Sequence, residues 1–265
     1  MSDKDAVPAV ADLLSLQGQR ALVTGGSGNI GRGIALRLAE AGADVVVHYQ
    51  SDADGAAQTV AAITAIGGNA ESLQADLTIA DEVAGMFGKL DRRGAPLSCA
   101  VNNAGGYPVQ GFAEMTAIEW QQVMAANLDS AVHVSRESIR RWCDGNVKGA
   151  IVNIASIEGT DPALGHSHYA TSKAGLLMLT RSLTLEYGGR GIRVNAVSPG
   201  LIAREGLEEN WPEGVANWHQ QAPLQRMGEA SDVADAVLFL LGPASRWISG
   251  VNLVVDGGMS TVSRW

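Results

Sequence analysis

The sequence predicts an α/β fold in which a doubly wound, seven-stranded parallel sheet is covered by helices on both faces. Short β-branched runs alternate with segments of 3.6-residue periodicity along the chain, which is typical of right-handed βαβ units. The strand runs are nearly continuous in apolar character, as strands buried on both faces require. No repeat or low-complexity linker divides the chain, so we expect a single domain over residues 1–265.

Each expected strand is a short apolar or β-branched run next to a turn. In chain order the strands are expected at 20–24, 44–49, 70–75, 98–102, 150–156, 192–198 and 251–256. Helices are expected where apolar residues recur at helical spacing, over 30–42, 116–142, 169–187 and 232–242. An amphiphilic, tryptophan-rich segment, 203–228, follows the sixth strand.

The composition argues against several classes of protein. A net charge of −9 does not suit a nucleic-acid surface, which needs clusters of basic residues. No apolar run approaches the roughly 20 residues of a membrane-spanning helix, so we expect no membrane association. The N-terminus carries acids in place of the basic start of a secretory signal, and Cys99 and Cys143 lack metal-ligand spacing. We therefore expect a cytoplasmic protein with reduced cysteines and no metal site.

A glycine-rich turn, TGGSGNIGRG at 24–33, lies between the first strand and the first helix. Ligands of such sheets bind beyond the carboxyl ends of the strands. Glycines at 25, 26, 28 and 31 let the backbone approach a pyrophosphate, and the following helix offers it free N–H groups. A tight structural turn does not explain four glycines together, so the turn predicts a nucleotide site.

The stretch SHYATSK at 167–173 places Tyr169 and Lys173 four residues apart, on one face of a helix. An ammonium beside a phenol stabilises the phenolate and lowers the pKa of the phenol, which makes a tuned acid/base. Taken alone, the pair is more typical of a surface tyrosine beside a surface lysine. Its interpretation therefore depends on the other motifs.

Together with NNAG at 102–105, NIAS at 153–156 and VSPGLI at 197–202, these features resemble the short-chain dehydrogenases/reductases from about residue 16 to the C-terminus. Thr24, Gly25 and Gly31 match the family's Thr-Gly-x-x-x-Gly-x-Gly turn, whereas Asn29 replaces its middle glycine. Asparagine tolerates a left-handed backbone, so we expect the turn to survive. The resemblance implies a Rossmann-type fold that binds a nicotinamide cofactor.

The resemblance also implies a catalytic tetrad of Asn127, Ser156, Tyr169 and Lys173. Tyr169 would exchange the proton that accompanies hydride transfer, and both Lys173 and the positive nicotinamide would lower its pKa. The Ser156 hydroxyl would donate to the substrate oxygen. By resemblance, Asn127 would hold a water that links Lys173 to solvent.

The residues that the resemblance assigns to the cofactor lie near the expected strand ends. They are Gly25, Ser27, Asn29, Ile30, Gly31, Tyr49, Gln50, Ser51, Asp76, Leu77, Asn103, Ala104, Gly105, Tyr169, Lys173, Pro199, Gly200 and Ile202. Tyr49 stands where NAD-dependent relatives carry an acid that binds the ribose, which favours NADP(H) over NAD(H). Against this, positions 28, 29, 50 and 51 hold no basic residue, and Asp52 adds a negative charge.

The predicted function is NAD(P)-dependent hydride transfer between the cofactor and a small secondary alcohol or ketone. One alternative is a C=N or C=C reductase on the same fold, and another is a catalytically silent cofactor-sensing or scaffold protein. Apolar residues on more than one face of the helices at 116–142 and 169–187 predict a homotetramer, with the C-terminal segment 251–265 completing a second interface. By resemblance, segment 203–228 forms a lid over the substrate.

Several polar and aromatic residues near these motifs keep two interpretations each. His166 and His168 belong either to a loop or to a second base, and Glu158 faces either the substrate cleft or solvent. Trp211 and Trp218 either line an apolar pocket or pack within the lid. Arg204 stands where many relatives have a threonine that binds the carboxamide of the cofactor, and it would also suit an acidic substrate.

Overall fold

The computed structural model describes residues 8–92 and 94–262. Within them, seven parallel strands form one sheet in the order β3-β2-β1-β4-β5-β6-β7. The strands are β1 (Arg20–Val23), β2 (Asp44–Tyr49), β3 (Asn69–Gln74), β4 (Cys99–Asn102), β5 (Ala150–Ile154), β6 (Arg193–Pro199) and β7 (Asn252–Val255). The predicted doubly wound sheet is confirmed.

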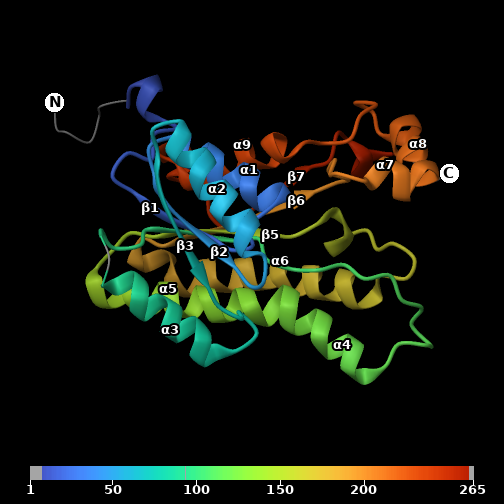
Figure 1. Cartoon of the computed structure of the whole chain (residues 1–265), viewed down its shortest axis with the longest axis horizontal. Coiled ribbons are helices and arrows are strands. Elements are labelled where there is room, and N and C mark those ends of the chain that lie inside the picture. Colours follow the sequence, from blue (N-terminus) through green and yellow to red (C-terminus); the bar gives the residue numbers. More distant parts are fainter. Residues whose placement is uncertain (1–7, 93, 263–265) are drawn as a thin grey trace.

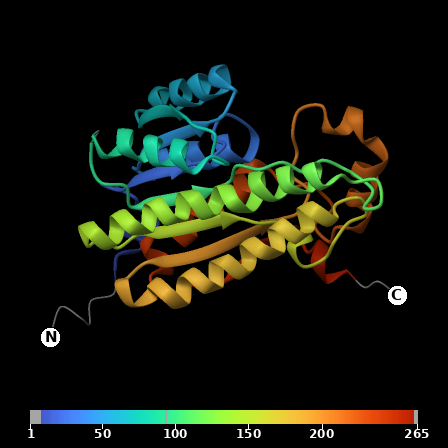
Figure 2. The ribbon, with the colours of Figure 1, turned by 90° about the horizontal axis from the view of Figure 1, so that it is seen from below.

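Helices cover both faces of the sheet (Figure 1). On one face lie α1 (Asn29–Glu40), α2 (Ala53–Ala65) and α9 (Ala230–Leu241). On the other lie α3 (Ala80–Asp91), α4 (Ala117–Met124), α5 (Ser130–Gly145) and α6 (Ser167–Tyr187). Figure 2 shows α4 and α5 running beside α6. The short helices α7 (Leu207–Asn210) and α8 (Pro212–Gln221) stand at one end of the sheet, in the predicted lid segment.

The expected burial of strands on both faces holds for the interior of the sheet but was wrong for its edges. Every residue of β1, β4 and β5 is buried. In β3, which reads NAESLQ, only Leu73 is buried, and in β7 no residue is. An edge strand has one neighbour only and is covered less completely, so polar side chains are tolerated there.

The helix predicted over 116–142 is interrupted. It begins with a capping box in which Thr116 and Glu119 satisfy each other's backbone N–H groups. A π-helical turn, Ala125–Asp129, then separates α4 from α5. Such turns insert one extra residue into a helix and occur often at functional sites. The turn contains Asn127, one of the predicted catalytic residues.

The order of the strands creates a switch point between β1 and β4, where the chain winds outward in opposite directions. In doubly wound sheets, ligands bind in the crevice that opens at the carboxyl ends of the strands there. Among the described residues, no helix has the length and apolar character needed to span a membrane.

Candidate active site

The predicted site residues gather at the carboxyl edge of the sheet. Those predicted to contact the cofactor are Gly25, Ser27, Asn29, Ile30 and Gly31 after β1, Tyr49, Gln50 and Ser51 at the end of β2, Asp76 and Leu77 after β3, Asn103, Ala104 and Gly105 after β4, and Pro199, Gly200 and Ile202 at the end of β6. Ser156 follows β5, and Tyr169 and Lys173 lie in the first two turns of α6.

The glycine-rich turn has the backbone that its sequence requires. Gly25 has a φ of 61° and Asn29 a φ of 44°, so the left-handed conformation expected at Asn29 is confirmed. A Cβ atom at Gly31 would lie 2.0 Å from the carbonyl oxygen of Gly25, so this position accepts only glycine. The turn therefore brings its backbone close to the start of α1.

The start of α1 suits an anionic ligand. Its N-cap residue, Gly28, makes no side-chain cap, and no acidic residue lies in the first turn. A Cβ atom at Gly28 would meet no atom within 4 Å, so the space in front of the helix is open. The free N–H groups and the positive end of the helix dipole therefore fit the pyrophosphate of a dinucleotide.

The turn after β1 is tied to the loop after β4 at the switch point. Nδ2 of Asn103 donates to the carbonyl oxygen of Thr24, at 2.9 Å, and the Thr24 hydroxyl accepts the N–H groups of Asn103 and Ala104. These bonds hold the two loops in one arrangement.

His48 is a positioning residue that the sequence analysis missed. Its Nδ1 accepts the N–H of Gly25 at 3.1 Å, and its Nε2 donates to the carbonyl oxygen of Ala75 at 3.0 Å. Burial lowers the pKa of His48, although the Ala75 carbonyl and the Asp76 charge oppose this. A neutral imidazole with its proton on Nε2 satisfies both bonds. A histidine within an otherwise apolar strand was the available signal.

Gln50 and Asp52, at the end of β2, each have a partner within the protein. Hydrogen bonds from Thr78, together with one from the Gln50 side chain, lower the pKa of Asp76. The Asp52 carboxylate accepts the N–H of Gly55 at 2.9 Å and caps α2. Its charge is held at the start of that helix.

Ser156, Tyr169 and Lys173 come together at the end of β5. The Ser156 oxygen accepts the N–H of Glu158 at 3.1 Å, which leaves its own proton free to be donated. The side chain of Lys173 is buried, and its Nζ lies 5.5 Å from the centre of the Tyr169 ring. Ser156 also hydrogen-bonds Tyr169, so the three side chains lie close together after β5.

The expected lowering of the pKa of Tyr169 by Lys173 was wrong for this structure. Burial raises the pKa of Tyr169 to about 12, against the hydrogen bond from Ser156, and the charge of Glu158 raises it further. Lys173 is not among the groups that shift this pKa, and its Nζ donates to the carbonyl oxygen of Ile154 at 2.8 Å. Burial lowers the pKa of Lys173 itself to about 8.

The side chain of Asn127 hydrogen-bonds the backbone of the loop after β4. Its Nδ2 donates to the carbonyl oxygens of Gly106, at 2.8 Å, and Val123, at 3.0 Å. Its Oδ1 accepts the N–H of Gly106 at 3.2 Å. A Cβ atom at Gly105 would lie 2.3 Å from Oδ1, so glycine is needed there. The π-helical turn points this amide toward the loop.

Comparison with known proteins shows the family to which the chain belongs. Over residues 25–260 the chain matches the family described as Enoyl-(Acyl carrier protein) reductase. It is 33% identical to Glucose 1-dehydrogenase 2 of Bacillus subtilis, over 92% of this chain and 96% of that protein. A crystal structure of a short-chain type dehydrogenase/reductase from Mycobacterium marinum matches with a TM-score of 0.88 and 34% identity, over 96% of this chain and 99% of that one. A gluconate 5-dehydrogenase from Burkholderia cenocepacia, in complex with NADP and tartrate, matches with a TM-score of 0.90 and 27% identity, over 96% and 100%.

The chain belongs to the short-chain dehydrogenase/reductase family. It is an NAD(P)-dependent oxidoreductase that acts on an alcohol or ketone. The residues around the glycine-rich turn fit the dinucleotide that this activity requires.

A Glu158–His166 pair lies beside the tyrosine of this short-chain dehydrogenase/reductase. Oε2 of Glu158 lies 2.9 Å from Nδ1 of His166, and the His166 ring packs edge-on against Tyr169 with centroids 5.9 Å apart. Glu158 is therefore turned toward the site. His168 is fully buried, and neither of its ring nitrogens has a hydrogen-bond partner. Across the described residues, no group of three or more His, Cys, Asp or Glu side chains is placed to hold a metal ion.

A second aromatic residue that the sequence analysis did not single out also contacts Tyr169. The ring of Tyr107 packs edge-on against Tyr169, with centroids 6.0 Å apart. Cζ of Arg204 lies 5.0 Å from the centre of the Tyr107 ring. The predicted lid segment thus contacts the catalytic region of this short-chain dehydrogenase/reductase through Arg204.

The two tryptophans of the predicted lid, Trp211 and Trp218, differ in their packing and exposure. Trp218 packs in a small core with Leu207, Val215 and Met227, and its Nε1 donates to the carbonyl oxygen of Arg226. Trp211 covers Gly214 and is half exposed. Trp218 thus packs within the lid, and its ring also lies against Gly200, so that a Cβ atom there would be 2.7 Å from the indole.

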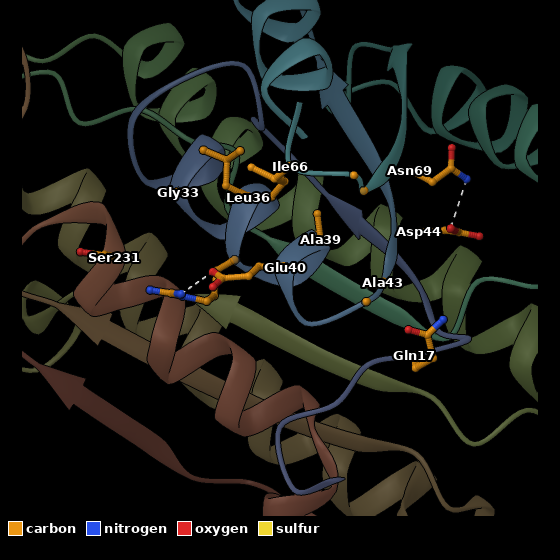
Figure 3. Close-up of a pocket in the computed structure, with 14 residues that line it drawn as sticks. Gln17, Gly33, Leu36, Ala39, Glu40, Ala43, Asp44, Ile66, Asn69 and Ser231 are labelled. Atoms are coloured by element: carbon orange, nitrogen blue, oxygen red, sulfur yellow. Dashed lines mark hydrogen bonds and ion pairs between the residues drawn. The ribbon is translucent and has the colours of Figure 1, made fainter. Parts of the chain in front are cut away.

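A groove of the protein lies away from these residues. It has a volume of about 860 Å³ and lies between α1, α9 and the amino ends of β2 and β3 (Figure 3). Asp44 and Asn69 hydrogen-bond each other on its wall. None of the predicted site residues of this short-chain dehydrogenase/reductase lines it.

Proposed function

We propose that this enzyme interconverts a secondary alcohol and a ketone in a small molecule, using Asn127, Ser156, Tyr169 and Lys173. The observation that carries the proposal is the hydrogen bond between Ser156 and Tyr169, with Nζ of the buried Lys173 5.5 Å from the centre of the Tyr169 ring. The test is a panel of alcohols and ketones, assayed by the absorbance of the reduced nicotinamide with both cofactors. Absence of turnover with every pair would overturn it.

Hydride transfer, proton donation and stabilisation of charge fall to different groups of the site. The cofactor, when bound, accepts or supplies the hydride. Tyr169 is a neutral phenol at neutral pH, so it donates its proton to the oxygen of a ketone as the alcohol forms. The Ser156 hydroxyl donates a second hydrogen bond to that oxygen and stabilises its developing charge. Asn127 keeps the loop after β4 in place.

Reduction of a C=C bond remains the second candidate, because the matching family is described as an enoyl reductase. Ser156 favours the carbonyl reaction, since its free proton suits an oxygen that gains charge. An unsaturated ketone separates the two reactions: carbonyl reduction gives an unsaturated alcohol, and C=C reduction gives a saturated ketone.

We propose that NADP(H) is preferred over NAD(H). Tyr49 ends β2, where an acid would repel a 2′-phosphate, and Asp52 is engaged as the cap of α2. The similar gluconate 5-dehydrogenase was crystallised with NADP. Ser51 is the side chain left to donate to the phosphate, because Gln50 bonds Asp76. A phosphate held without a guanidinium binds less tightly, so the preference is modest.

We also propose a homotetramer built from one domain with a lid over 203–228. Apolar side chains remain exposed on the elements predicted to pair, among them Val132 on α5, Leu185 on α6 and Val254 on β7. Such faces are typical of contacts between subunits. Residues 263–265 of the predicted second interface lie outside the described residues. Sedimentation of a monomer at micromolar concentration would count against the proposal.

For the cell, we propose a cytoplasmic location. Cys99 is buried in β4 and Cys143 lies in α5, and both are free thiols, as is usual in a reducing compartment. Fractionation of cells that express the protein would test this.

A further inference from the structure

Arg204 places a cation next to the catalytic region. It follows β6, and its Cζ atom lies 5.0 Å from the centre of the Tyr107 ring. That ring packs edge-on against Tyr169, with centroids 6.0 Å apart. Stacking on an aromatic ring orients a guanidinium without consuming its N–H donors. The Tyr107 ring thus contacts both the cation and the ring of the catalytic tyrosine.

The charge of Arg204 has no protein partner. Over residues 8–92 and 94–262 its guanidinium makes neither an ion pair nor a hydrogen bond. Another lid arginine shows the usual arrangement: Arg226 donates to both carboxylate oxygens of Asp232, at 2.7 and 2.9 Å. Arg204 therefore has its donors available to a ligand.

A negative charge also lies near Tyr169. Glu158 lies close enough to Tyr169 to raise the pKa of the phenol, and its carboxylate is held by His166 at 2.9 Å. His166 and Tyr107 each pack edge-on against Tyr169. A substrate anion is repelled by Glu158 and attracted by Arg204, which favours its binding at Arg204.

Exposed apolar side chains lie on the neighbouring loops. Val109 and Phe112 follow Tyr107 in the loop after β4, and Leu164 lies in the loop before α6. A hydrogen bond from Gln110 N to the Gly165 carbonyl oxygen, at 2.8 Å, joins the two loops. An unpaired cation near apolar side chains suits one anionic group on an otherwise carbon-rich ligand.

We propose that Arg204 determines specificity by binding a carboxylate of the substrate, so that the substrate is a hydroxy acid in oxidation and a keto acid in reduction. This inference rests on the proposed function. In oxidation the carbinol C–H bond would break with its electron pair leaving as hydride to the bound nicotinamide, and the hydroxyl proton would pass to the phenolate form of Tyr169; reduction would run in the reverse direction from the neutral phenol. The carboxylate is unchanged by the reaction and only binds. A competing role for Arg204, as a ligand of the cofactor, predicts a different pattern of kinetics.

The test compares each keto acid of a panel with its own methyl ester, with NADPH, in the wild type, Arg204→Gln, Arg204→Lys and Arg246→Gln. Arg246 is an exposed arginine that lines a groove by the amino ends of β4 and β5, so its variant makes the same charge change far from the site. In parallel, the melting temperature of each NADP⁺ complex is measured with the acid and with the ester.

For the wild type we expect at least one acid to exceed its ester in kcat/KM by about ten-fold or more. Arg204→Gln should reduce this ratio about 10- to 100-fold, mainly through KM of the acid, as expected for the loss of a charged hydrogen bond. Arg204→Lys should keep part of the ratio, and Arg246→Gln should keep all of it. The acid should raise the melting temperature of the wild-type complex and not that of Arg204→Gln.

The inference would be overturned if the wild type used esters as well as acids. It would also be overturned if Arg204→Gln kept the wild-type ratio of kcat/KM for acid and ester, or if this variant raised KM for NADPH equally with acids and esters. Absence of turnover with all compounds would overturn the proposed function instead. The melting temperatures would then still decide whether Arg204 binds a carboxylate.

Discussion

Nζ of Lys173 donates a hydrogen bond of 2.8 Å to the carbonyl oxygen of Ile154, the last residue of β5. The bond anchors the ammonium below the catalytic tyrosine, in surroundings that lower the pKa of Lys173 to about 8. The same burial raises the pKa of Tyr169 to about 12. The resting site therefore holds a neutral phenol that is a proton donor, beside an ammonium that is close to losing its charge.

Tyr169→Phe is expected to lower kcat more than ten-fold and to leave cofactor affinity nearly intact, because the change removes the proton donor and keeps the ring. Lys173→Ala should lower both kcat and the affinity for the cofactor. Single-turnover rates and cofactor titrations by fluorescence measure the two effects separately. If Tyr169→Phe retains more than a tenth of the wild-type kcat, the proton transfer belongs to another group.

Glu158→Gln is expected to move the pH profile of alcohol oxidation toward lower pH, by up to about one pH unit. The Glu158 charge raises the pKa of Tyr169, and oxidation requires the phenolate of this residue. Removal of the charge therefore lowers the pH at which the phenolate forms. His166→Asn keeps that charge and should leave the profile in place or move it to higher pH. The measurement is kcat/KM from pH 6 to 10. Equal profiles for Glu158→Gln and the wild type would contradict the assignment.

Lys173 should make the stability of the wild type rise with pH relative to Lys173→Met. The folded pKa of Lys173 lies near 8, below its ordinary value of 10.5, so the unfolded chain binds more protons between these pH values. Tyr169, with its raised pKa, opposes this only above pH 10. From pH 8 to 10 the difference in unfolding free energy should change by on the order of 2 kcal/mol. Urea titrations at both pH values test it, and a constant difference would refute it.

His48→Phe is expected to weaken cofactor binding about ten-fold and to lower the melting temperature. The change leaves the N–H of Gly25 and the carbonyl oxygen of Ala75 without partners, at about 1–3 kcal/mol each. In the wild type the lowered pKa of His48 keeps the ring neutral, so affinity should be full above pH 6.5 and fall as the ring is protonated at lower pH. Fluorescence titrations at pH 7 and 5.5 measure both effects. An unchanged dissociation constant in His48→Phe would show that the bond to Gly25 does not position the turn.

Tyr49→Asp should reverse the cofactor preference. The wild type is expected to prefer NADP(H) about ten-fold in kcat/KM, a difference of about 1.4 kcal/mol. An aspartate at the end of β2 would bond the ribose hydroxyl of NAD(H) and repel the 2′-phosphate. The ratio of kcat/KM for the two cofactors, with one substrate, measures this. A wild type that prefers NAD(H) would mean that Asp52 or Asp54 reaches the ribose.

Features that depend on local backbone geometry were predicted correctly from the sequence. The alternation of strands and helices indicated the seven-stranded sheet, because the hydrophobic period of each segment reflects its own secondary structure. The left-handed conformation of Asn29 was predicted because few residue types adopt it.

Features that depend on contacts between distant segments were missed. The π-helical turn was not foreseen, because Asn127 bonds Gly106, 21 residues away, and apolar periodicity carries no record of that contact. The role of His48 was missed for the same reason, since its partners Gly25 and Ala75 lie on other strand ends.

The sequence by itself determined the fold, the family and the placement of Ser156, Tyr169 and Lys173 at one edge of the sheet, because parallel strands deliver their following loops to the same edge. Only the tertiary structure decided the protonation of that site. The pKa of a phenol depends on how deeply it is buried and on which charges face it, and Lys173 turned out to bond Ile154 while Glu158 faces Tyr169. The same holds for Arg204, whose approach to Tyr107 arises because the lid packs over the loop after β4.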